Sequence, residues 1–259
     1  MYRIWLPVLL ITCSGIPGMA DDSASDLLVK AEAAAGQHYS QMAVELATAA
    51  ISKDPRLGNA YYLRGRERFR LGQIPGSLED FDKFVELRPD LASRQWERGI
   101  ACYYAKQFET DARQFELYQT FHDNDVENSV WRYLCMVPTV GVVKARAVML
   151  PIKNDRRVPM MQVYELYRGN LQPDDVLAAC HKGNPPPDVL AKRLFYAHLY
   201  LGLYYEVAGK KELAAKYIHL AADKRLAKNR GINRYMWDVA RIHEASLQKH
   251  LDAGGGKNE

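Results

Sequence analysis

The sequence predicts an all-α fold that is built from repeated helix–turn–helix units. Three observations predict it: a residue pattern that recurs every 34 positions, helical spacing of the apolar residues, and turn residues between the helices. Gly65 and Gly99 are 34 residues apart, and so are Pro55 and Pro89. Units of this length bury their apolar faces against neighbouring units and leave a concave surface for a partner.

Residues 1–20 have the pattern of a secretory signal peptide. Arg3 is the only charged residue, Ile4–Thr12 is almost wholly apolar, and small residues precede a cleavage point after Ala20. The apolar run is too short to cross a bilayer, so we expect an exported protein, periplasmic or extracellular, without a transmembrane segment. The alternative is a lipoprotein modified at Cys13, but the threonine before this cysteine disfavours lipidation.

The net charge and the cysteines restrict the kinds of partner and crosslink. A formal charge of +4 is too mild to indicate nucleic acid or an anionic membrane as the partner. Cys102, Cys135 and Cys180 remain after the leader, and an odd number excludes full pairing within the chain. We therefore predict buried thiols that pack as small apolar groups, with a Cys135–Cys180 disulfide as the alternative.

Residues 21–125 are expected to form three N-terminal units. Each unit contains two amphipathic helices that are joined by a turn and followed by a proline or another turn-forming residue. The expected units cover residues 24–57, 58–91 and 92–125. In the second unit, Gly65 lets two helices approach closely, and Gly72 ends the first helix in a left-handed cap.

The repeat weakens and then returns. Residues 126–194 are expected to form two degenerate units, whereas residues 195–228 again match the pattern well. Gly202 lies 103 residues after Gly99, one residue more than three periods, and this phase favours one continuous solenoid. Residues 229–251 are expected to form a C-terminal capping helix, and the glycine-rich residues 252–259 a disordered tail.

These motifs resemble the tetratricopeptide repeat. The resemblance is carried by Tyr61, Arg64-Gly65, Leu71-Gly72, Phe81 and Pro89, and it covers nearly all of the chain after the leader. It implies a right-handed superhelix that binds peptides or protein surfaces. Together with the leader, the arrangement resembles the NlpI-type periplasmic adaptors, which are lipoproteins that dock cell-wall hydrolases and proteases. This chain departs from them at the lipidation site.

The first helices of the units supply the candidate partner-binding residues. Aromatic and arginine side chains anchor protein interfaces, and several are expected to face the concave groove. These groove residues are Tyr62, Arg66, Phe69, Arg70, Trp96 and Tyr103. The alternative is that the aromatic rings pack against neighbouring helices and that the arginines form a solvated face.

The sequence contains no pattern of a metal, cofactor or catalytic site. Its seven histidines show no metal-ligand spacing, and no phosphate-binding or nucleophile motif is present. We therefore expect a non-catalytic protein-interaction adaptor in a bacterial cell envelope, which binds a peptide or helix of a partner protein and needs no cofactor. The alternatives are a self-assembling structural protein of the envelope, forming homo-oligomers, and an enzyme of uncharacterised type.

Overall fold

The computed structural model describes residues 21–255, and every element in this range is a helix. The helices are α1 (Ala24–Gly36), α2 (Ser40–Lys53), α3 (Gly58–Arg70), α4 (Ile74–Leu87), η1 (Pro89–Arg94), α5 (Trp96–Tyr104), α6 (Phe108–Gln119), α7 (Val126–Ala147), α8 (Met160–Arg168), α9 (Pro173–His181), α10 (Pro187–Val207), α11 (Lys211–Ala221), η2 (Lys224–Lys228) and α12 (Arg234–Gly255). The predicted leader, residues 1–20, lies outside the described residues. Because α12 continues to Gly255, part of the segment expected to be a disordered tail is helical. The expected all-α class is confirmed.

The turns between paired helices show the 34-residue step in their backbone geometry. His38, Gly72 and Lys106 are spaced at this step, and all three have left-handed φ angles, of 66°, 75° and 60°. In each turn the next amide donates to a carbonyl five residues earlier, which satisfies the end of the preceding helix. These bonds are Tyr39 to Ala34, 2.9 Å, Gln73 to Arg68, 2.8 Å, and Gln107 to Cys102, 2.9 Å. The turn is therefore the same local structure in three successive units.

Small residues let the two helices of a unit approach closely. A Cβ atom built on Gly99 would lie 2.7 Å from the buried ring of Phe115, and one on Gly202 would lie 2.6 Å from Ile218. Real Cβ atoms do not approach this closely, so larger residues would push the helices apart. The glycines that carry the repeat in the sequence are thus close-packing positions of α5 against α6 and of α10 against α11.

The middle of the chain departs from regular pairing. Within α7, Gly141 has φ 81° and ψ 162°, which separates a long first part from a short second part. Residues 148–159 then run without helix to α8. Arg157 fixes this segment to the start of α7, because its guanidinium donates to Asp125 and Glu127 at 2.6 Å each.

The apolar interior is divided into two clusters. A small one joins α1, α2 and the start of α3, and a large one runs from α3 to α12. Cys102, Cys135 and Cys180 are buried thiols of the large cluster, as predicted, and the Cys135–Cys180 disulfide is not formed. No helix among residues 21–255 is both long enough and apolar enough to span a bilayer.

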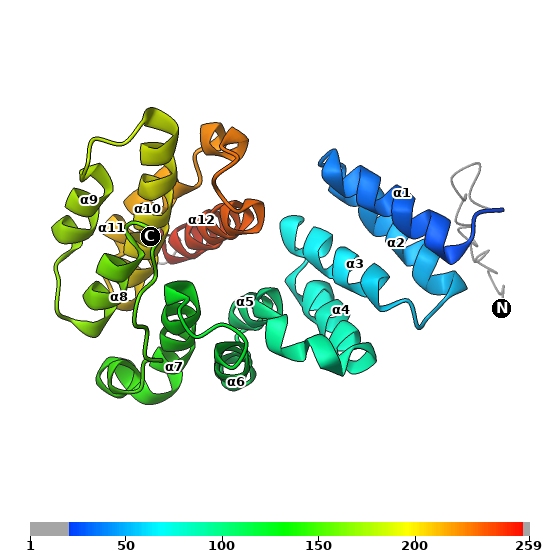
Figure 1. Cartoon of the computed structure of the whole chain (residues 1–259), viewed down its shortest axis with the longest axis horizontal. Coiled ribbons are helices and arrows are strands. Elements are labelled where there is room, and N and C mark those ends of the chain that lie inside the picture. Colours follow the sequence, from blue (N-terminus) through cyan, green and yellow to red (C-terminus); the bar gives the residue numbers. More distant parts are fainter. Residues whose placement is uncertain (1–20, 256–259) are drawn as a thin grey trace, which may run out of the picture.

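The last helix lies inside the arc that the earlier helices form. In Figure 1, α1–α4 lie on one side and α7–α11 on the other, with α12 between them. It packs on α11 and reaches back to α3. The Tyr235 hydroxyl donates to the Glu97 carbonyl at 3.4 Å, and the Tyr104 hydroxyl lies 3.1 Å from Nδ1 of His243. The helix expected to cap the C-terminal end therefore also contacts α3 and α5.

Candidate partner-binding cleft

Four of the six predicted groove residues line one cleft. Tyr62, Arg66 and Arg70 project from α3 and Trp96 projects from α5, around a cleft of about 710 Å³. The first three residues are spaced at four-residue intervals on α3, which places them on one helix face. The structure thus brings together side chains from the second and third expected units.

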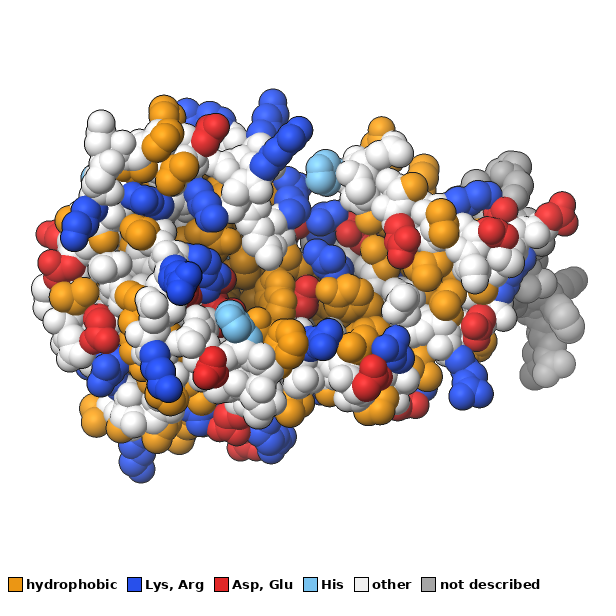
Figure 2. Space-filling model, viewed as in Figure 1, with side chains coloured by type: hydrophobic (Ala, Val, Ile, Leu, Met, Phe, Trp, Pro, Cys, Tyr) orange, Lys and Arg blue, Asp and Glu red, His pale blue; other side chains and the backbone are white. Residues whose placement is uncertain are grey.

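The lining of the cleft combines apolar and charged side chains. Its lining comes from α1, α3, α4, η1 and α5, with Leu63, Phe84 and Leu91 among the apolar side chains. In Figure 2 the middle of the molecule is hollowed, with hydrophobic side chains inside the hollow and basic side chains beside it. Such a surface offers both apolar burial and charge pairing to a protein segment.

Phe69 also faces the inside of the arc, but α12 covers it. Its ring is fully buried and stacks on Tyr235 of α12, with centroids 4.6 Å apart and planes 19° apart. Tyr235 also meets Trp96 edge to face at 5.3 Å. The chain's own last helix therefore occupies the position that was expected to receive a partner beside Phe69.

Tyr103 lies away from the cleft. Its ring makes edge-to-face contacts with Tyr104 and Trp131, at 5.3 Å in each case, and with Phe108 at 6.0 Å. It is half-buried against the large apolar cluster and is absent from the lining of the cleft. Its contacts agree with the alternative considered for aromatic residues, in which they pack against neighbouring helices.

A buried carboxylate organises the lining between α3 and α5. Glu97 is 4% exposed, and its Oε1 atom accepts a hydrogen bond of 2.8 Å from the Tyr62 hydroxyl. Burial raises the pKa of Glu97, and the guanidinium of Arg66 opposes this shift. Burial and the neighbouring Glu97 carboxylate also raise the pKa of Tyr62. The hydrogen bond to Glu97 thereby holds the Tyr62 ring in place and occupies the donor of its hydroxyl group.

The two predicted arginines of α3 differ in how strongly the protein holds them. Arg70 is bound at both ends of its guanidinium, by Asp238 of α12 at 2.8 Å and by Glu67 at 2.9 Å. Arg66 has one ion pair within residues 21–255, a 4.0 Å contact with Glu97. Its guanidinium lies over the rings of Tyr62 and Tyr235, at 5.6 and 5.9 Å. Arg66 therefore keeps donors for an incoming carboxylate, whereas Arg70 joins α3 to α12.

The contribution of α12 to this region could not be predicted from local sequence patterns. Tyr235 and Asp238 lie more than 130 residues from their partners on α3 and α5, so no local pattern links them. One signal was available: α12 carries Tyr235, Met236, Trp237, Val239, Ala240 and Ile242, all buried. Six apolar residues within eight positions cover more of a helix than one neighbour can bury, which indicates contacts on several sides.

Comparison with known proteins gives a similarity over part of the chain. No protein-family model matches the chain. Over 107 residues, the chain is 32% identical to Protein SGT1 homolog of Oryza sativa subsp. japonica. The match covers 41% of this chain and 29% of the rice protein, so it spans less than a third of that relative. Together with the all-helical structure, this similarity fits a protein of the tetratricopeptide-repeat type.

Proposed function

We propose that this protein is a non-catalytic interaction adaptor, and that the cleft between α1, α3, η1 and α5 binds a segment of a partner protein. The proposal rests on Arg66, because its guanidinium has only a weak ion pair and lies over the ring of Tyr62 in the cleft. Guanidinium groups bind carboxylates through two parallel hydrogen bonds, and aromatic residues supply contact area. The partial similarity to Protein SGT1 homolog supports a protein of this type.

The charges of the cleft favour an acidic partner segment. Arg94 is an exposed second cation of the lining, and its guanidinium lies over Phe121 at 4.7 Å. Glu97 and Glu67 are almost fully buried and already contact Tyr62 and Arg70, whereas Glu32 is the exposed acid. An incoming carboxylate would therefore meet two accessible cations, while an apolar side chain beside it would contact the apolar side chains of the lining.

Partner capture from native extracts tests this assignment. We expect Arg66→Glu to reduce recovery of the partner by about tenfold, because a carboxylate at this position repels an acidic segment. Arg56→Glu is the matched control, because Arg56 is exposed and does not line the cleft. Equal recovery with both variants would exclude the cleft as the binding site.

The cellular location is also part of the proposal. Export rests on the pattern of residues 1–20, with processing after Ala20. N-terminal sequencing of the protein from its native cells should give a chain that starts at Asp21. A chain that keeps Met1–Ala20 would contradict export but would leave the cleft assignment intact.

A further inference from the structure

A second cavity, which Trp96 also lines, lies between α5, α6, the start of α7 and α12. It has a volume of about 180 Å³. Its inner wall is apolar and is formed by Ile100, Phe115, Trp131 and Met236, each of which is at most 2% exposed. A wholly apolar cavity of about 150 Å³ is large enough to bind benzene. The space therefore suits a small molecule that has an apolar body.

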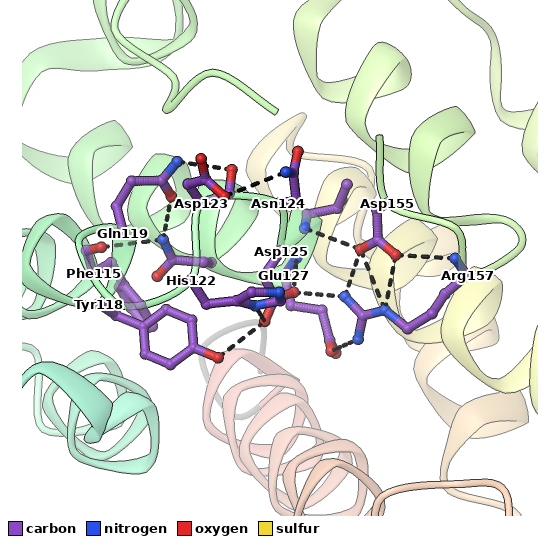
Figure 3. Close-up of polar contacts among 12 residues, drawn as sticks. Phe115, Tyr118, Gln119, His122, Asp123, Asn124, Asp125, Glu127, Asp155 and Arg157 are labelled. Carbon is purple, nitrogen blue, oxygen red and sulfur yellow. Dashed lines mark hydrogen bonds and ion pairs between the residues drawn. The ribbon is translucent and has the colours of Figure 1, made fainter. Parts of the chain in front are cut away.

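The polar side chains of the cavity lining carry an excess of negative charge, with Asp125 and Glu127 against Arg157. Figure 3 shows Asp125, Glu127 and Asp155 gathered around the guanidinium of Arg157. The three carboxylates lie 2.5–2.6 Å from Arg157 nitrogens, so one cation is shared among three anions. Asp125 and Glu127 line the cavity together with Arg157, and the side chains of the two acids are 15% and 16% exposed. A cation that enters the cavity would thus approach two poorly hydrated carboxylates.

Asp125 has one carboxylate oxygen that the protein binds only weakly. Its Oδ1 atom accepts from Arg157 at 2.6 Å and from the backbone amide of Glu127 at 3.1 Å. Its Oδ2 atom has the Tyr118 hydroxyl at 3.4 Å and Nδ1 of the exposed His122 at 3.9 Å. By comparison, both oxygens of Glu127 are bonded more closely, by Tyr200 at 2.8 Å and by Arg157 at 2.6 Å. Oδ2 of Asp125 is therefore an acceptor that a ligand can use.

We propose that this cavity is a binding site for a small organic ammonium ion. The ammonium group would donate to Asp125 beside Glu127, and the apolar body would lie against Trp131 and Phe115. Carboxylates in a partly dry site hold a cation more strongly than they do in water, and the aromatic rings supply apolar contact area for the body of the ligand. An anionic ligand of the same shape would face the uncompensated carboxylates, so the site discriminates by charge.

Three probes of nearly equal size test this preference: benzylammonium, benzyl alcohol and benzoate. Isothermal titration of the chain after the leader should give benzylammonium a Kd of about 1 mM or below, with benzyl alcohol at least about tenfold weaker and benzoate without binding. Absence of benzylammonium binding at about 10 mM overturns the proposal, and so does equal binding of the alcohol.

Variants then locate the binding event. Asp125→Asn should weaken the binding of benzylammonium until its affinity equals that of benzyl alcohol. Glu116→Gln should leave the affinities of both ligands unchanged. Glu116 is a matched control, because it pairs with Arg132 at 2.6 Å and lies outside the cavity lining. Ile100→Phe adds volume to the inner wall and should abolish binding of benzylammonium and the alcohol alike, which serves as a second test if Asp125→Asn fails to fold. Unchanged benzylammonium binding in Ile100→Phe would place the ligand elsewhere.

Discussion

The contact between Asp238 and three arginines allows a quantitative test of how α12 is held. The Asp238 carboxylate is 1% exposed and accepts from Arg70 at 2.8 Å, with Arg241 at 3.4 Å and Arg234 at 3.8 Å. Asp238→Asn keeps the shape of the side chain but removes its charge, which leaves three guanidinium groups around a neutral amide. Breaking a buried pair costs about 3–5 kcal/mol. We expect Asp238→Asn to lower the free energy of unfolding by about 3 kcal/mol, because Arg234 and Arg241 remain partly hydrated and only Arg70 loses a short ion pair.

Urea denaturation followed by circular dichroism measures this loss against a matched control. Asp82 accepts from Arg98 at 2.7 Å, almost the same distance, but is 49% exposed. Asp82→Asn should therefore cost less than about 1 kcal/mol, as surface pairs do. A second check is Arg70→Met combined with Asp238→Asn, which should lose less than the sum of the single variants. If Asp238→Asn loses no more than Asp82→Asn, the inference that burial makes this contact strong is refuted.

Three further predictions concern packing, pH and the ion cluster. Gly99→Ala should lower the free energy of unfolding by about 1–3 kcal/mol, because the added Cβ atom would clash with Phe115. Gly36→Ala should raise it by about 0.5–1 kcal/mol, because a Cβ atom there meets nothing within 4 Å. Thermal melting compares the two variants. Burial lowers the pKa of His198 to about 4, while the unfolded chain binds that proton from about pH 6.5. Stability should therefore fall as pH drops through this window, and between about pH 7 and 4.5 the His198→Gln variant should lose less stability than the native chain in urea titrations. Arg157→Met should lower the free energy of unfolding by about 2 kcal/mol near pH 7, which is less than the loss of a fully buried pair because Arg157 is 39% exposed. Part of this loss should return on acidification, as the three carboxylates take up protons. A pH profile of urea midpoints that matches that of the native chain would contradict this prediction.

The repeat could be predicted from the sequence because its structural cause is local. A left-handed turn, a close-packing glycine and an apolar helix face each depend on residues within one unit. The left-handed turn at Gly72 and the close helix approach at Gly65 were therefore predicted from the sequence, and a Cβ atom built on Gly65 would lie 3.2 Å from Asp80. The same reasoning did not predict left-handed angles at His38 and Lys106, because these residue types tolerate the conformation without favouring it as glycine does.

The candidate site could be predicted only in part, because its remaining residues are set by contacts between distant segments. Tyr62, Arg66 and Trp96 were found from their positions on the first helices of the units. The burial of Phe69 depends on Tyr235, which follows it by more than 160 residues. Likewise, the cluster around Arg157 joins residues about 30 positions apart through an irregular segment. Such pairs leave no periodic signal in a single sequence.

The return of α12 to α3 has a consequence for how the chain is made. Synthesis proceeds from the N-terminus, and early segments fold as they emerge. Until α12 has left the ribosome, the rings of Phe69 and Trp96 lack their cover, although every residue of α3 and α5 is already present. The nascent protein therefore exposes the Phe69 ring, which is fully buried in the finished protein, and more of the Trp96 ring, which α12 covers only in part. A chaperone that binds apolar segments would meet the Phe69 ring only during that interval, and release would coincide with docking of the last helix.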